Sequence, residues 1–275
     1  MNELTRADTG CDLLCDLMSP GLDIPPTKYE VFANPPLKAM LGQVRFPPVL
    51  KIANLSALSA LQDDIRDEWP DFTQEQQINL VIGPGGQQPQ PGPQQIFRFT
   101  SADKVWNIVL TTDAVTIETT GGGKYSAYEE FAKRFRQVWD GLREHFAPAA
   151  VLGQGLRYID HLEEGARSPK EWARLINPEL MGPLAGRLGA GLEQAISDYR
   201  FRDGDTVLIF KHGIIPTGPE NVPGYLLDFD HFTDQPRDDV STDAVMERFA
   251  GYHEQSYAFF RWCVTDEALE GFRGD

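Results

Sequence analysis

Residues 105–119, VWNIVLTTDAVTIET, and residues 128–146, YEEFAKRFRQVWDGLREHF, decide the fold class. The first stretch contains two short strand patterns, at 105–111 and 114–119, joined by a tight turn at Thr112 and Asp113. The second stretch carries an apolar stripe at helical spacing, made of Tyr128, Phe131, Phe135, Val138, Trp139 and Leu142. Two antiparallel strands followed by a long amphipathic helix predict a helix packed on one side of an antiparallel sheet.

The same order of elements returns near the C-terminus, although the residue identities do not match. Strand patterns at 206–212 and 224–232 flank a loop at 213–224, and a long helix follows at about 242–262. Further strands are expected within 29–46, at 77–82, 96–100 and 152–161, and helices at 53–68 and after Pro169. Along 37–46 the more apolar alternate set, which includes Met40, Val44 and Phe46, is expected to face the core. We therefore predict an α+β protein of antiparallel sheets with helices on one side, in two lobes, 27–160 and 161–275.

Residues 1–26 form an acidic tail, with five acidic residues and one basic residue. Cys11, Leu14, Cys15 and Met18 share one face of a short helix pattern, which is below the ~12–15 residues that an isolated helix needs. The tail either docks on its own protein, docks on a partner through residues such as Leu14 and Met18, or stays unfolded. Residues 83–95 are all Gly, Pro or Gln, so they predict a flexible surface loop without a clean PxxP docking motif.

The composition and charge of the chain exclude or disfavour several classes of protein. The chain has 275 residues and a net charge of −16, which disfavours nucleic-acid partners. Arg134, Arg136 and Arg143 still make a local basic patch on the predicted helix 126–146. No apolar run approaches a membrane span, no secretory signal opens the sequence, and three cysteines are too few for a disulfide scaffold, so we expect a cytoplasmic protein.

The most site-like cluster is Asp228, Asp230 and His231. On a strand the two carboxylates share one face, and carboxylates with an imidazole can bind a metal ion or act as acid and base. A solvated strand face has the same pattern. A second cluster, Arg157 to His161 with Asp160 in it, would lie close by if strands 152–161 and 224–232 pair, and His253 of the last helix could join or border the core. Gly121 to Gly123 lack the Lys-Ser/Thr of a phosphate loop, so no cofactor is predicted.

Four segments in one order resemble an uncharacterised, sporadically distributed bacterial protein family. They are PPLKAMLGQVRFPP at 35–48, GLRYIDHLE at 155–163, LLDFDHF at 226–232 and VMERFAGYHEQSYAFFRWCVTDEA at 245–268. The resemblance spans about 29–272, with Lys38 and Ala39 where an acidic residue is typical and Asp160 where Asn is typical. It implies no established activity and no catalytic residues. A patchy distribution is typical of mobile genes, such as those of phage defence or toxin neutralisation.

These observations favour a non-enzymatic interaction subunit or sensor, in a phage-defence or toxin–antitoxin-like system, over an enzyme. The alternative is a metal-dependent hydrolase or nuclease that uses Asp228, Asp230 and His231. Residues 221–275 hold twelve acidic and four basic residues. Their net charge of −8 is half of the net charge of the chain. We therefore expect a partner protein with a basic surface at Asp234, Asp238 and Asp239, with a second copy of the chain as a further partner to consider.

Overall fold

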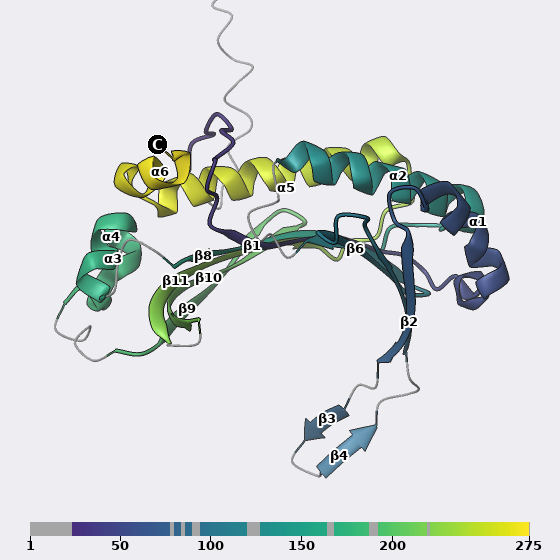
Figure 1. Cartoon of the computed structure of the whole chain (residues 1–275), viewed down its shortest axis with the longest axis horizontal. Coiled ribbons are helices and arrows are strands. Elements are labelled where there is room, and N and C mark those ends of the chain that lie inside the picture. Colours follow the sequence, from purple (N-terminus) through teal and green to yellow (C-terminus); the bar gives the residue numbers. More distant parts are fainter. Residues whose placement is uncertain are drawn as a thin grey trace, which may run out of the picture.

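A nine-stranded antiparallel sheet forms the body of the protein, in the order β2-β5-β6-β7-β1-β8-β11-β10-β9 (Figure 1). The computed structural model describes residues 24–77, 80–83, 86–89, 94–119, 127–163, 168–186, 192–218 and 221–274. The strands of the sheet are β1 (Leu37–Arg45), β2 (Asp71–Gln77), β5 (Gln94–Thr100), β6 (Trp106–Leu110), β7 (Ala114–Thr119), β8 (Gly153–Leu162), β9 (Ala195–Asp203), β10 (Thr206–Thr217) and β11 (Val222–Thr233). A separate hairpin pairs β3 (Leu80–Gly83) with β4 (Gly86–Pro89). The α+β class with antiparallel pairing is confirmed.

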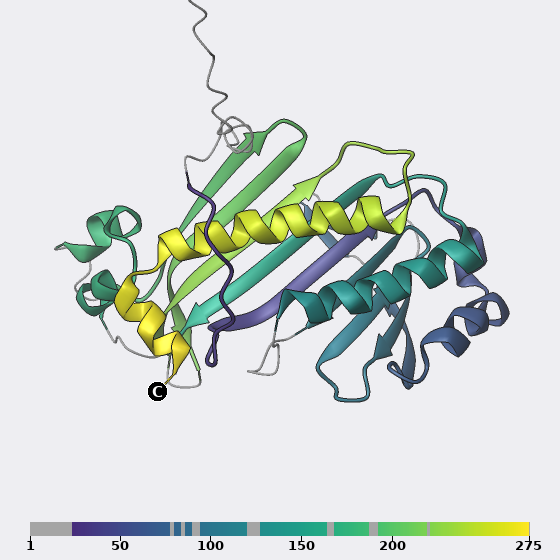
Figure 2. The ribbon, with the colours of Figure 1, turned by 90° about the horizontal axis from the view of Figure 1, so that it is seen from above.

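The long helices lie on the convex side of the curved sheet (Figure 1). The helices are η1 (Leu50–Ala53), α1 (Leu55–Ile65), α2 (Tyr128–Phe146), α3 (Pro169–Leu175), α4 (Pro178–Met181), η2 (Gly182–Ala185), α5 (Thr242–Cys263) and α6 (Asp266–Arg273). In Figure 2, α2 and α5 run side by side across this face, joined by contacts such as Phe135 with Phe249. Figure 1 shows none of the described helices beneath the concave face, so within the described part of the chain helices cover only one side of the sheet. No described helix is long and apolar enough to cross a membrane.

The two halves of the chain build equivalent parts of this sheet. Each half starts with a central strand, β1 or β8, and these two strands pair with each other. The last strand of each half, β7 or β11, then pairs with the first strand of the same half. The predicted echo therefore appears in the topology, but the halves share one sheet and one hydrophobic cluster rather than forming separate lobes. The predicted boundary at 160/161 lies inside β8, where a break would cut the centre of the sheet.

Alternation along the strands separates a buried face from an open one. In β1, Met40 and Val44 are fully buried under the helices, as the pattern predicted, whereas Gln43 and Arg45 are exposed on the concave face. Gly42 lies under α2, where an added Cβ would come within 2.2 Å of the Phe131 ring. A side chain at this position would push α2 away from the centre of the sheet.

Several boundaries differ from the predictions. Strand β2 and helix α6 were not predicted, and the predicted loop 213–224 instead continues the ladder of β10 and β11 up to Thr217 and Val222. Residues 86–89 and 94–95, predicted as loop, belong to β4 and β5. A ladder is made by backbone hydrogen bonds, so Gly, Pro and Gln residues can extend it without an apolar pattern that would reveal it.

Candidate functional site

A cavity lies on the helix side of the sheet, in the second half of the molecule. It has a volume of about 90 Å³ and is enclosed by residues 29–37, by β8 and β11, and by α5. In Figure 2 the segment that precedes β1, drawn in dark purple, crosses over α5. Residues 29–37 therefore meet, at this cavity, two strands and a helix that follow them in the chain by more than 100 residues.

The crossing segment is held by several contacts. The backbone N–H of Glu30 donates to the Tyr257 hydroxyl at 2.9 Å, and its carboxylate pairs with Arg273 at 2.7 Å and with Arg261 at 3.3 Å. The ring of Tyr29 packs edge-on against Tyr257, with 4.9 Å between centroids. These contacts make residues 29–36 a fixed wall of the cavity.

Asp160 lines this cavity as a buried carboxyl group. Its side chain is 6 % exposed, and within the described part of the chain no hydrogen bond or ion pair is formed by it. Burial, together with the nearby charge of Asp228, raises the pKa of Asp160 to about 8. At neutral pH the group is mostly protonated, and it can ionise if a positive charge enters the cavity.

Three histidines of the same half, of which His212 and His231 are buried and His253 is partly buried, are bound to hydroxyl groups. The Nδ1 atoms of His253, His231 and His212 lie 2.9, 2.9 and 2.8 Å from the hydroxyls of Tyr158, Ser256 and Tyr225, respectively. Burial lowers the pKa of His253 and of His212 to about 4 and that of His231 to about 3. At neutral pH these rings are uncharged, and they join the sheet to α5 or to a neighbouring strand.

The sheet separates the predicted set Asp228, Asp230 and His231. The expected pairing of β8 with β11 is present, and Asp228 and Asp230 share the concave face. Asp228 is held there by Arg157, which donates to both carboxylate oxygens at 2.8 and 2.7 Å. His231 points to the other face, where it bonds Ser256 of α5. The three side chains do not converge, because neighbouring strand residues project to opposite faces.

The concave face is a second candidate surface. Its charged residues balance: they are the basic Arg45, Arg98, Arg157, Arg200, Arg202 and Lys211 and the acidic Asp71, Glu75, Glu118, Asp198, Asp228 and Asp230. Partly exposed apolar residues lie between them, including Leu41, Ile159, Ile209, Leu226 and Phe232. Arg200 lies over the Phe232 ring at 5.9 Å. The face is therefore neutral in a chain of net charge −16.

The predicted partner-binding acids have different roles in the structure. Asp239 accepts a hydrogen bond from the backbone N–H of Ser241 at 2.8 Å, just before α5. The side chain and the backbone of Ser241 together lower the pKa of Asp239. Asp234 and Asp238 are exposed on the same loop. Leu14 and Met18 lie outside the described residues, as do Gly121 to Gly123.

The predicted basic patch on α2 is engaged in ion pairs. Arg134 pairs with Glu130 at 3.1 Å, and Arg136 pairs with Asp243 at 2.8 Å. Arg143 donates to the Thr242 hydroxyl at 3.1 Å. These arginines join α2 to its surroundings, which weakens the case for a nucleic-acid surface on this helix.

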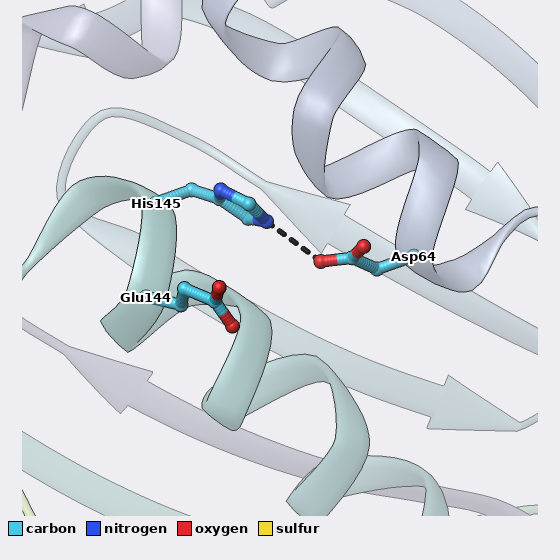
Figure 3. Close-up of side chains that lie close together, drawn as sticks. All are labelled: Asp64, Glu144 and His145. Atoms are coloured by element: carbon cyan, nitrogen blue, oxygen red, sulfur yellow. Dashed lines mark hydrogen bonds and ion pairs between the residues drawn. The ribbon is translucent and has the colours of Figure 1, made fainter.

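A surface group that the sequence did not suggest joins α1 to the end of α2 (Figure 3). Asp64, Glu144 and His145 each place a ligand atom within 4.8 Å of the others, and Asp64 lies 2.6 Å from the Nε2 of His145. Such a set could bind a metal ion, and Asp64 and His145 also form an ordinary helix-to-helix hydrogen bond. Asp64 is about 80 positions from His145, so only the packing of the two helices could reveal the group.

No protein-family model matches the chain, and no curated protein matches it either. The resemblance to the sporadically distributed bacterial family therefore stays a prediction.

Proposed function

We propose that the protein is a non-enzymatic interaction subunit that holds a partner protein on the concave face of its sheet. The observation that carries this proposal is the one-sided coverage of a nine-stranded sheet (Figure 1). Antiparallel sheets often leave one face to water, and such a face is normally polar. Here apolar residues and arginines alternate across it, a mixture that is enriched at protein interfaces.

The charge distribution supports a partner with a basic surface. The concave face is neutral, so it does not repel such a partner, and the remaining surface carries the net negative charge of the chain. Long-range attraction would then raise the association rate, whereas apolar contacts would hold the complex. Asp234 and Asp238 are part of the attracting surface. A cytoplasmic role in phage defence or a toxin–antitoxin-like system is the context that we propose for this subunit.

The geometry favours this function over the metal-dependent hydrolase. His231 is on the opposite face from Asp228 and Asp230, and Asp228 is already paired with Arg157. A bound metal found by elemental analysis, together with turnover that Asp230→Ala abolishes in a folded protein, would reverse this preference.

The test is to identify the partner by affinity capture, purify it and measure its affinity for defined variants. Leu41→Glu and Ile209→Glu place a charge on the concave face, and each should weaken binding by at least about tenfold. Leu50→Glu is the matched control, because Leu50 is 79 % exposed and belongs to η1, outside the sheet. If the folded concave-face variants bind as tightly as the wild type, the concave face is not the docking surface.

A further inference from the structure

The cavity that contains Asp160 has features of a ligand site that are independent of the concave face. Six aromatic rings line it, and they come from the crossing segment, from two strands and from α5. The rings are those of Tyr29, Phe32, Tyr158, Phe229, Tyr257 and Phe260. Aromatic faces carry partial negative charge, so a cavity lined by them attracts cations.

The hydroxyl groups of the cavity are already used within the protein. The Tyr158 hydroxyl is bound to His253, the Ser256 hydroxyl is bound to His231, and the Tyr257 hydroxyl accepts from the backbone N–H of Glu30. Asp160 differs, because no polar partner of it lies in the described part of the chain. Its carboxyl group is therefore the one that remains for a ligand.

A buried carboxyl group without a partner is costly, and its charged form is costlier still. A positively charged group with N–H donors would remove this cost, because it supplies a charge and charge-assisted hydrogen bonds. An anion would be repelled by the aromatic faces and could not gain from the ionised form of the carboxyl group. A neutral apolar molecule would leave the carboxyl group unsatisfied.

We propose that this cavity binds an alkylammonium group, which belongs either to a small free amine or to a lysine side chain of another protein. The volume of about 90 Å³ is well above the ~10–15 Å³ that a single water molecule requires. A short alkylammonium group can therefore enter this space. The compact ammonium group suits a single carboxylate surrounded by rings.

The pH dependence of binding follows from Asp160. Its pKa of about 8 means that more of it is ionised as the pH rises from about 6 to 9, while an alkylammonium group of lysine type stays charged. The other titratable or charged groups around the cavity are Tyr29, Tyr158, Tyr257, Glu30 with Arg261, His253 and Cys263. The charge of Asp228, on the other face of the sheet, also raises the pKa of Asp160. The pKa of His253 is lowered to about 4, and burial raises those of Tyr29 and Cys263. Binding should tighten with pH across this range.

The experiment is calorimetric titration of the full chain with n-butylammonium chloride and, as the neutral analogue, n-butanol. We expect binding of n-butylammonium at least about tenfold tighter than that of n-butanol. Asp160→Asn keeps the shape and removes the charge, so it should abolish this preference. Glu163→Gln is the matched control, because Glu163 is an exposed carboxylate next to the same strand, and it should bind like the wild type.

Two further measurements keep the proposal open to refutation if Asp160→Asn fails to fold. Tyr29→Leu removes one aromatic wall and should weaken n-butylammonium binding severalfold, and the pH profile of the wild type needs no variant.

A peptide with a central lysine, compared with its norleucine analogue, separates the two sources. Binding of the peptide without the free amine assigns the site to a protein side chain, and binding of the free amine without the peptide assigns it to a small molecule. If neither the amine nor the peptide binds, or if n-butanol binds equally well, the proposal is wrong.

Discussion

The two halves of the molecule share a topology but differ in what they bury under the helices. In the first half, β5 and β6 place Phe97, Phe99, Trp106 and Ile108 in the hydrophobic core under the helices, and all four are fully buried. In the second half, β8, β10 and β11 place Asp160, His212 and His231 at the same depth. The first core is stabilised by apolar packing, which does not depend on pH. The second contains buried titratable groups, so its stability depends on pH, and the cavity lies there.

The largest expected effect is that of Asp160 on how the free energy of unfolding changes with pH. Its pKa is raised in the folded state from 3.8 to about 8, so the folded protein binds the proton more tightly than the unfolded chain. The free energy of unfolding must therefore fall as the pH rises from about 4 to 8, by on the order of 5 kcal/mol. Asp160→Asn should remove this loss, as measured by urea unfolding at several pH values.

Comparing Asp160→Asn with the wild type separates the effect of Asp160 from that of the histidines. The histidines make the protein more stable as the pH rises, and their effect is complete near pH 6.5. Glu163→Gln serves as the control, because its exposed ion pair with Lys38 contributes about 1 kcal/mol or less. An equal slope in the wild type and in Asp160→Asn would contradict the contrast between the two halves.

Gly42→Ala should destabilise the protein through packing alone. The added methyl group would meet the Phe131 ring at 2.2 Å, and forced overpacking costs about 1–3 kcal/mol. The loss should be the same at pH 5 and pH 8, since it involves no titration. Gly251→Ala is the matched control, because among the described residues no atom outside its own stretch of helix lies within 4 Å of the added Cβ, and alanine favours a helix interior. If the loss of stability caused by Gly42→Ala depended strongly on pH, the contrast between the two halves would be wrong.

His231→Asn should reduce the sensitivity of the protein to acid. The pKa of His231 is lowered from 6.5 to about 3, so the unfolded chain binds the proton more tightly below pH 6.5 and stability falls there. At pH 5 this residue alone should cost about 2 kcal/mol relative to pH 7. Thermal or urea unfolding at both pH values should show a smaller difference in the variant. A difference as large as in the wild type would place the acid sensitivity elsewhere.

Neutralising Asp234 and Asp238 should give the smallest effect. Replacing both with Asn should slow association with the purified partner a fewfold at low salt and flatten its salt dependence, with little change in stability. Asp239→Asn tests a structural role instead, because Asp239 bonds the backbone before α5. Stopped-flow association rates at low and high salt are measured for the double variant and for Asp239→Asn. Unchanged rates would show that the loop does not steer the partner.

The candidate sites were harder to predict than the fold, for reasons visible in particular residues. The apolar stripes of α2 and α5 are periodic, so their helices were predicted to within about two residues of their ends. Asp160 was noticed beside His161, but the two face opposite sides of the sheet, and only the contacts of residues 29–36 with α5 turn Asp160 into part of a cavity. Asp228, Asp230 and His231 looked like one cluster because they are adjacent in the chain.

The sequence by itself determined most of the local elements, including α2 and α5, and the apolar side of β1, because alternation and helical spacing are properties of neighbouring residues. It also determined the acidic charge. Only the tertiary structure decided that β1 pairs with β8, that the two halves share one sheet, and that residues 29–36 cover Asp160. These contacts join residues more than 100 positions apart, and no local pattern encodes which distant surfaces will meet.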